Sequence, residues 1–117
     1  MNSMMAGLCC GEPCTVSWDI INNFANAFIA CSDDYAARGM RLFGMPQNGD
    51  ARIVSGESGA VTAGVLAALM QDPELAQLRN ELGLDENSRV LLISTEGATD
   101  KVNYLKVLSG KWKPENK

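Results

Sequence analysis

Residues 52–70 read RIVSGESGAVTAGVLAALM and contain two structural elements joined by a turn. RIVS is a short apolar run typical of a strand, and SGESG is a glycine-rich turn. AVTAGVLAALM is apolar or small nearly all round, so a helix formed from it has to be covered on most sides. The stretch therefore predicts a strand, a turn and a helix that lies between a sheet and another layer.

A second unit of the same kind lies nearer the end of the chain. RVLLIS, residues 89–94, is a continuous apolar run, as expected for a parallel strand buried on both faces. The turn STEGATD follows, and Thr99 or Asp100 can cap the next helix. The alternation of strands and helices predicts an α/β fold with a mostly parallel sheet flanked by helices, in which 52–55 and 89–94 are neighbours.

Capping residues and apolar periodicity predict further helices. Ser17 can cap one helix, and Ser32 with Asp33 can cap the next. Pro73 suits the first turn of a later helix, which Gly83 would end. Helices are expected near 17–28, 33–43, 59–70, 73–82 and 99–108, and a short strand is a candidate at 28–31.

Length and charge limit the class of protein. A chain of 117 residues is long enough for a single domain over 1–117, or for a fragment of a larger one. Its net charge of −4 argues against a nucleic-acid surface, which needs clustered lysine and arginine. No apolar run is long enough for a membrane span, and residues 1–15 do not resemble a signal peptide. These observations predict a soluble, cytoplasmic chain.

The chain contains no histidine. Ser-His-Asp and Cys-His nucleophiles, histidine-bound zinc and the commonest general base are therefore excluded within this sequence. Chemistry by this chain has to use carboxylates, hydroxyls, lysines, thiols or a cofactor.

Four cysteines allow three interpretations. Three of them are bunched and one stands alone, so the paired spacing that usually holds zinc is missing. Buried free thiols are the favoured interpretation, and a disulfide from the cluster to the distant cysteine stays open. The residues are Cys9, Cys10, Cys14 and Cys31.

The two turns admit a structural and a functional interpretation. Ser58 as a helix cap with one glycine would explain most of SGESGA, but not Glu57. Glycines at 56 and 59 would also let a planar ligand approach the backbone, with Glu57 in contact with it. In STEGATD, Glu96 is either solvated or part of a site in which Ser94 presents its hydroxyl at the strand end. Ligands of open α/β sheets bind at that edge, so Glu57 and Ser94 are expected to open into one cleft there.

Several motifs together resemble one enzyme family. They are MAGLCCGEPCTVSWDII, FIACSDDYAARGMRLFG, RIVSGESGAVTAGVLAALM and LGLDENSRVLLISTEGATDKVNYLKV, which span roughly residues 4–110. Together they are similar to the carboxy-terminal part of the diaminopropionate ammonia-lyases, pyridoxal-phosphate enzymes of fold type II. The combination of GEP, SGESGAV and ISTEG is specific, whereas each piece alone is not.

The resemblance implies a cofactor and an activity. The family uses pyridoxal 5'-phosphate for α,β-elimination on 2,3-diaminopropionate, which gives pyruvate and ammonia. Ser94 corresponds to the hydroxyl that faces the pyridine nitrogen, and Thr95 is its neighbour. A neutral hydroxyl there makes the cofactor a milder electron sink than an aspartate would. Gly56, Glu57 and Ser58 correspond to the glutamate-containing turn beside the ring; other members often carry proline where this chain has Ser58.

The same resemblance implies a missing portion. The Schiff-base lysine and the glycine-rich phosphate loop of such enzymes lie in their amino-terminal part, whereas the first lysine here is Lys101. The chain is therefore expected to be a fragment whose partner is the amino-terminal portion of the enzyme. It is expected to lack a catalytic lysine, to bind the cofactor weakly or not at all when isolated, and to form a homo-oligomer. The alternative is a non-catalytic binding or self-assembling module derived from the same fold.

Overall fold

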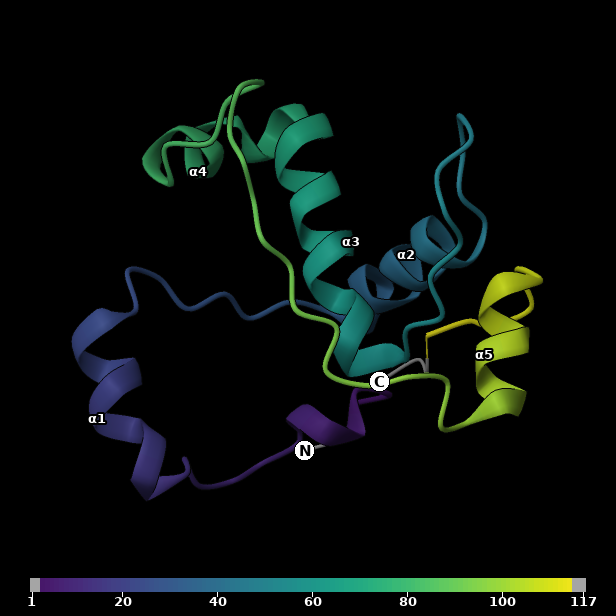
Figure 1. The fold of residues 1–117 in the computed structure, drawn as a ribbon, viewed down its shortest axis with the longest axis horizontal. Helices are drawn as coiled ribbons and strands as arrows, with labels where there is room; N and C mark the ends of the chain where they lie inside the picture. Colours follow the sequence, from purple (N-terminus) through teal and green to yellow (C-terminus); the bar gives the residue numbers. More distant parts are fainter. Residues whose placement is uncertain (1–2, 115–117) are drawn as a thin grey trace.

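The computed structural model describes residues 3–114, and these residues form helices joined by long extended segments (Figure 1). The described part measures 39 × 35 × 30 Å along its principal axes. Its elements are η1 (Ala6–Leu8), α1 (Thr15–Phe24), α2 (Asp33–Gly44), α3 (Glu57–Gln71), η2 (Pro73–Leu75), α4 (Ala76–Glu81) and α5 (Lys101–Leu108).

Helices α2 and α3 cross with their backbones in direct contact. A Cβ atom on Gly39 would lie 1.9 Å from the carbonyl oxygen of Ala60, and one on Gly64 would lie 1.8 Å from that of Tyr35. Both distances are far below van der Waals contact, so only glycine fits at either position. Small buried residues surround the crossing on both helices: Ala36, Ala37, Ala60, Ala63 and Ala68.

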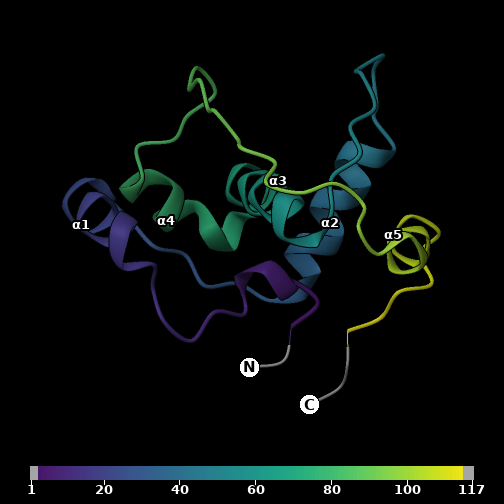
Figure 2. The same cartoon turned by 60° about the horizontal axis from the view of Figure 1, so that its bottom comes forward.

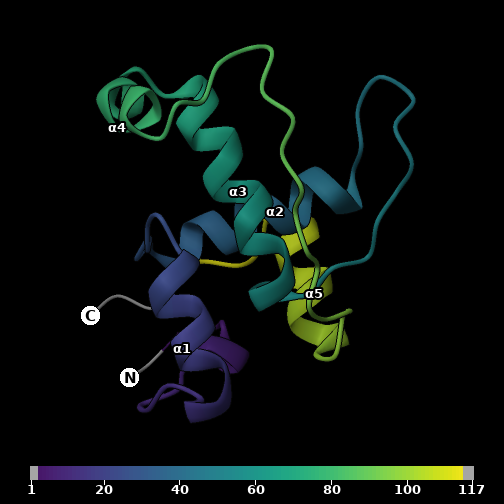
Figure 3. The same ribbon diagram turned by 60° about the vertical axis from the view of Figure 1, so that its left-hand side comes forward.

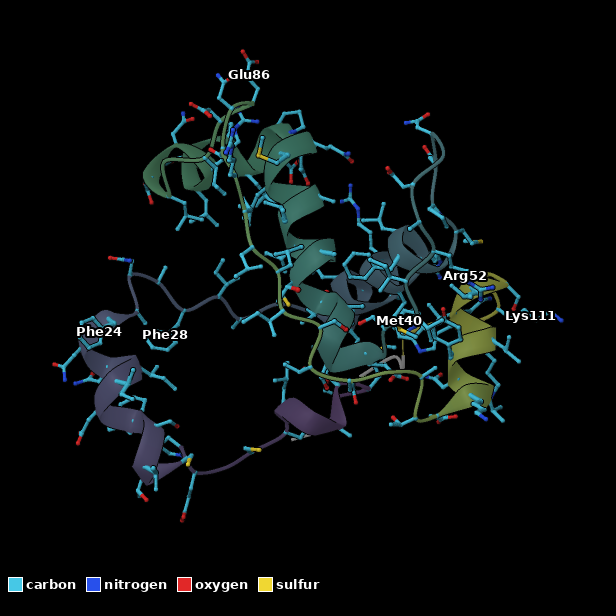
Figure 4. All side chains as sticks on the ribbon, viewed as in Figure 1. Phe24, Phe28, Met40, Arg52, Glu86 and Lys111 are labelled. Carbon is cyan, nitrogen blue, oxygen red and sulfur yellow. The ribbon has the colours of Figure 1, made fainter. Side chains whose placement is uncertain are left out.

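Helix α5 completes the core beside α2. Tyr104 and Val107 of α5 are buried against Ala37 and Met40 of α2, and Met40 is fully enclosed (Figure 4). The Arg41 side chain joins the same two helices, because its Nε–H donates to the Val107 carbonyl oxygen at 2.9 Å. The core of the described residues is therefore a small three-helix cluster of α2, α3 and α5.

Helix α1 stands apart from α2 and α3 and has no buried residue (Figures 1 and 2). The predicted helix over 17–28 is confirmed only in part, because the chain becomes extended at Ala25, with φ −73° and ψ 128°. Its apolar face is uncovered, with Val16 87% exposed and Phe24 78% exposed; Phe28 just beyond is 71% exposed (Figure 4).

The other predicted helices are confirmed within a few residues. Helix α5 is capped by Asp100, whose carboxylate accepts from the Asn103 N–H at 2.9 Å, which decides between the two candidate caps. Pro73 opens η2 at its first position, and α4 ends at Glu81, two residues before the positive-φ glycine Gly83. Helix α3 begins at Glu57, two residues before the predicted start.

The predicted α/β fold with a mostly parallel sheet is wrong, because the described residues contain no strand. A ladder needs repeated backbone pairs between neighbouring segments. Among the described residues, no backbone hydrogen bond joins 52–55 to 89–94. The nearest one lies just beyond both segments, from the Gly56 N–H to the Glu96 carbonyl oxygen at 3.1 Å, and the Ile53 N–H instead donates to the Phe43 carbonyl oxygen. The segments without strand pairing are 28–31, 52–55 and 89–94.

The apolar runs behind that prediction are extended but uncovered. Residues 89–97 run alongside α3 towards its first turn (Figures 1 and 3). Val54 is 51% exposed, Leu91 86% and Ile93 67%, so the expected burial of both faces is also wrong. In a complete sheet, the edges of such segments pair with neighbouring strands, and their apolar faces are covered by other parts of the protein.

Within residues 3–114, no helix is long and apolar enough to cross a membrane.

Candidate functional site

The SGESG and STEG turns meet at the first turn of α3. The side-chain hydroxyls of Ser55 and Ser94 lie 2.7 Å apart, and the Gly56 N–H donates to the Glu96 carbonyl oxygen at 3.1 Å. Ser55 is fully buried, whereas Ser94 and Thr95 are exposed. Two serines 39 positions apart in the sequence are thus in contact, one of them fully buried and the other an exposed residue.

The two glycines of SGESG allow this meeting. A Cβ atom on Gly56 would lie 2.3 Å from the Gly97 carbonyl oxygen. One on Gly59 would lie 2.8 Å from Ser55 Oγ and 3.0 Å from Ser94 Oγ. The STEG turn therefore fills the space beside both glycines. The close approach that the glycines permit is that of the STEG turn to α3, and not that of a planar ligand.

Glu96 occupies the amino-terminal end of α3. Its Oε1 accepts from the Ser58 backbone N–H at 2.6 Å. The N–H groups of the first helical turn have no acceptor within the helix, and a carboxylate there accepts a hydrogen bond from one of them. The negative charge of the carboxylate also lies at the positive end of the helix dipole. Ser58 lies inside the first helical turn, and its own hydroxyl is buried without a hydrogen-bond partner in the described residues.

Replacing Glu96 should loosen this end of the helix. Glu96→Ala removes the carboxylate that caps α3, so we expect the free energy of unfolding to fall by about 1 kcal/mol. Thermal unfolding followed by circular dichroism measures the change. Glu86→Ala is the matched control, since Glu86 is exposed in the loop after α4, far from the first turn of α3 (Figure 4). Equal melting temperatures for the two variants would contradict the capping role.

Glu57 is held in a fixed orientation on the same turn. The residue is only 6% exposed, and its Oε1 accepts from the Asn103 side-chain amide at 2.6 Å. This contact ties the first turn of α3 to α5. Glu57 also lines the cavity described next, and a carboxylate there can accept a hydrogen bond from a ligand.

A cavity of about 1370 Å³ opens along α3. Its walls are largely apolar, and its charged groups are all carboxylates: Asp33, Asp34, Glu57, Glu96 and Asp100. No lysine or arginine of the described residues lines it. Such a lining suits apolar surface and hydrogen-bond donors, but it offers no cation to an anionic group.

The structure distributes the predicted site residues over two places. Glu57 lines the cavity, while Ser94 and Thr95 lie outside its lining and open to solvent on the neighbouring turn. The expected single cleft at a sheet edge is therefore wrong, because the sheet is absent. The sequence does not predict the residues that hydrogen-bond to these predicted site residues and to the first turn of α3. The one available signal concerned Ser55, because a serine ends each of the two predicted strands. The missed residues are Ser55, Glu96 as a cap, and Asn103.

The four cysteines are free, but none is buried, so the expected burial is wrong. The Cys14 thiol lies at the start of α1, where hydrogen bonds from the backbone and side chain of Ser17 and from the backbone of Val16 lower its pKa. Partial burial raises the pKa of the Cys31 thiol, and the negative charge of Asp33 raises it further. Cys14 is therefore more readily ionised than Cys31.

The chain is similar in sequence to enzymes of known activity. It is 50% identical over 108 residues to diaminopropionate ammonia-lyase of Escherichia coli strain K12, which covers 92% of this chain and 27% of that protein. The Salmonella typhimurium enzyme of the same name is 48% identical over 105 residues, covering 89% of this chain and 26% of that protein. The chain thus spans about a quarter of these relatives. No protein-family model matches it.

Solved structures agree with these relatives. The Escherichia coli diaminopropionate ammonia-lyase, crystallised with an aminoacrylate–PLP azomethine reaction intermediate, matches with a TM-score of 0.88 and 49% identity over 95% of this chain and 29% of that one. The apo form of that enzyme matches with a TM-score of 0.79 and 48% identity over 85% of this chain and 28% of that one. The helical arrangement of this chain therefore corresponds to one part of a larger enzyme.

Proposed function

We propose that this chain, which is homologous to the carboxy-terminal part of diaminopropionate ammonia-lyase, supplies the ring-nitrogen side of a pyridoxal 5'-phosphate site. The activity would be α,β-elimination on 2,3-diaminopropionate, with pyruvate and ammonia as products. The observation that carries the proposal is the exposed residue Ser94, whose hydroxyl contacts that of Ser55 beside the turn that bears Glu57. The proposal includes a cytoplasmic location, a homo-oligomeric state, and no contact with nucleic acid or membrane.

The donor set fits the aromatic ring of the cofactor. Ser94 offers a neutral hydroxyl, which can hydrogen-bond a pyridine nitrogen without adding charge. The cavity beside it is apolar with carboxylates and without cations among the described residues, which suits a ring and disfavours a phosphate. When bound, pyridoxal phosphate supplies the electron sink that the elimination requires.

Each predicted site residue has a role in this proposal. Ser94 hydrogen-bonds the ring nitrogen, and Thr95 borders the ring beside it. Glu57, fixed by Asn103, faces the ring substituents from the first turn of α3, with Gly56 and Ser58 forming the backbone on either side. These residues bind and orient the cofactor; none of them is proposed to form a covalent bond with substrate.

The part of the enzyme that this chain does not span is the proposed partner. We assign to it the Schiff-base lysine and the backbone N–H groups that hold the phosphate. The uncovered apolar segments support this partnership, because Leu91, Ile93 and Val54 present surface that a neighbouring strand would cover. In this proposal, the partner also supplies the positively charged side chains that the cavity lining lacks among the described residues.

A chain exchange tests the proposal. The matching 108-residue segment of the Escherichia coli enzyme is replaced by this chain, and pyruvate and ammonia release from 2,3-diaminopropionate are assayed. We expect the chimera to retain cofactor and turn over substrate, with the unaltered Escherichia coli enzyme as reference. A folded chimera that self-associates without binding cofactor would instead support the non-catalytic module.

Substitutions at Ser94 in the chimera test its role. Ser94→Ala removes the hydrogen bond to the ring nitrogen, and we expect elimination to slow by about tenfold. Ser94→Asp places an anion there, which holds the nitrogen protonated and should shift the visible absorption band of the cofactor. Ser109→Ala is the control, because that exposed hydroxyl lies at the end of α5. Unchanged rate and spectrum in both Ser94 variants would contradict the assignment.

A further inference from the structure

Glu57 is a carboxylate that is nearly enclosed at the first turn of α3. Only 6% of the residue is exposed, and its Oε1 accepts from the Asn103 side-chain amide at 2.6 Å. Its second oxygen makes no hydrogen bond to the described residues, and the residue lines the large cavity. A carboxylate removed from water is costly unless its oxygens are hydrogen-bonded or paired with a positive charge. Glu57 therefore needs a further donor, which the described part of the chain does not supply.

Asn103 fixes one end of this carboxylate. An amide N–H can only donate, so it holds Glu57 Oε1 as an acceptor. Asn103 is itself held where α5 begins, because its backbone N–H donates to Asp100 Oδ1 at 2.9 Å. Among the described residues, the contact between Asn103 and Glu57 is the only side-chain hydrogen bond that joins α3 to α5. Asn103 thus engages one oxygen of Glu57 and leaves the other for a donor from outside these residues.

The charges around the cavity indicate that this donor is a cation. No lysine or arginine of the described residues lines the cavity with Glu57, and its other charged groups are Asp33, Asp34, Glu96 and Asp100. A cationic donor binds a carboxylate more strongly than a neutral one does. In the proposed reaction, the cofactor phosphate and the substrate carboxylate are anions and do not suit this place.

The substrate of the proposed reaction carries two amino groups. The amino group at carbon 2 reacts with the cofactor, as in other pyridoxal-phosphate enzymes of amino acids. The ammonium group at carbon 3 is then the free cationic donor of the substrate, and it is also the group that leaves as ammonia.

We propose that Glu57, oriented by Asn103, binds the carbon-3 ammonium group of 2,3-diaminopropionate and so distinguishes this substrate from amino acids without that group. The inference rests on the proposed function, and it assigns recognition of the leaving group to this chain. Glu57 would contact the substrate directly, whereas Asn103 acts through Glu57 as a positioning residue.

The test compares two ligands of the chimera. D-serine, with which the Escherichia coli enzyme has been crystallised, carries a hydroxyl where 2,3-diaminopropionate carries the carbon-3 amino group. In Asn103→Leu we expect KM for 2,3-diaminopropionate to rise about tenfold, while the inhibition constant of D-serine changes less than about twofold. Asn103→Gln keeps an amide donor and should restore most of the affinity. Asn80→Leu is the matched control, because Asn80 is exposed on α4 and lies outside the cavity lining.

A second variant separates recognition from support of the fold. Glu57→Gln keeps the size of the side chain and removes its charge, so it should lose affinity for 2,3-diaminopropionate and keep that for D-serine. Equal losses for both ligands in the Asn103 and Glu57 variants would mean that the pair supports the fold or faces another part of the enzyme. That result, or unchanged constants for both ligands, would overturn the inference while the proposed function stands. A parent chimera that holds no cofactor would overturn both.

Discussion

Gly64→Ala is expected to separate α2 from α3 and unfold most of the core. The added Cβ would lie 1.8 Å from the Tyr35 carbonyl oxygen, and a backbone atom cannot move aside as a side chain does. The two helices have to shift apart, which uncovers the alanines packed between them. We expect a loss of about 3 kcal/mol in the free energy of unfolding, measured by thermal and denaturant unfolding under circular dichroism.

Gly39→Ala should behave in the same way, since its Cβ would meet the Ala60 carbonyl oxygen at 1.9 Å. Gly11→Ala is the matched control, because a Cβ there would meet nothing within 4 Å. That variant should be as stable as the parent or slightly more so. If all three variants unfolded together with the parent, the tight crossing of α2 and α3 would be refuted.

The isolated chain is expected to bind pyridoxal phosphate weakly or not at all and to release no ammonia from 2,3-diaminopropionate. Its first lysine, Lys101, opens α5 and is exposed, so it is poorly placed for an imine with the cofactor. The acidic lining of the cavity also gives the phosphate no cation among the described residues. A visible spectrum after dialysis and a pyruvate assay measure the two activities.

The matched experiment adds the remaining part of the Escherichia coli enzyme in trans. Cofactor binding and ammonia release should appear only when both parts are present. A stoichiometric imine band on the chain alone, together with turnover, would show that it is a self-sufficient enzyme and would contradict the division of the site.

The helices could be predicted from the sequence because their signals are local. Asp100 caps α5, Pro73 opens η2 and a positive-φ Gly83 follows α4, and each acts within a few residues. The predicted helix over 17–28 overlaps α1 but runs too far, because the apolar pattern continues after Phe24 while the backbone becomes extended at Ala25. The crossing of α2 and α3 depends on Gly39 and Gly64, whose pairing no local pattern reveals.

The predicted sheet is wrong because an apolar run indicates that a segment is covered but not which part of the protein covers it. Residues 89–94 have the composition of a central strand, yet a strand forms only where a neighbour offers its backbone. Within residues 3–114 that neighbour is absent, so Leu91 and Ile93 stay exposed. The chain covers about a quarter of its relatives, which is consistent with coverage from elsewhere.

The sequence predicts single candidate residues for the site but not the contacts between them. The turns and the family resemblance predict Glu57 and Ser94 as site residues, and this stays a prediction. Their partners in the structure, Asn103 and Ser55, lie 46 and 39 positions away. Such contacts are set by the packing of α5 and of the second turn against α3. Sequence spacing carries no information about them.

The most direct measurement of the central claim is a crystal structure of the chimera with pyridoxal phosphate bound. We expect Ser94 Oγ to lie about 2.8 Å from the ring nitrogen, within hydrogen-bonding distance, with Ser55 behind it. A ring nitrogen that faces solvent or a residue outside this chain, with Ser94 beyond hydrogen-bonding reach, would contradict the claim that this segment forms the ring-nitrogen side of the site.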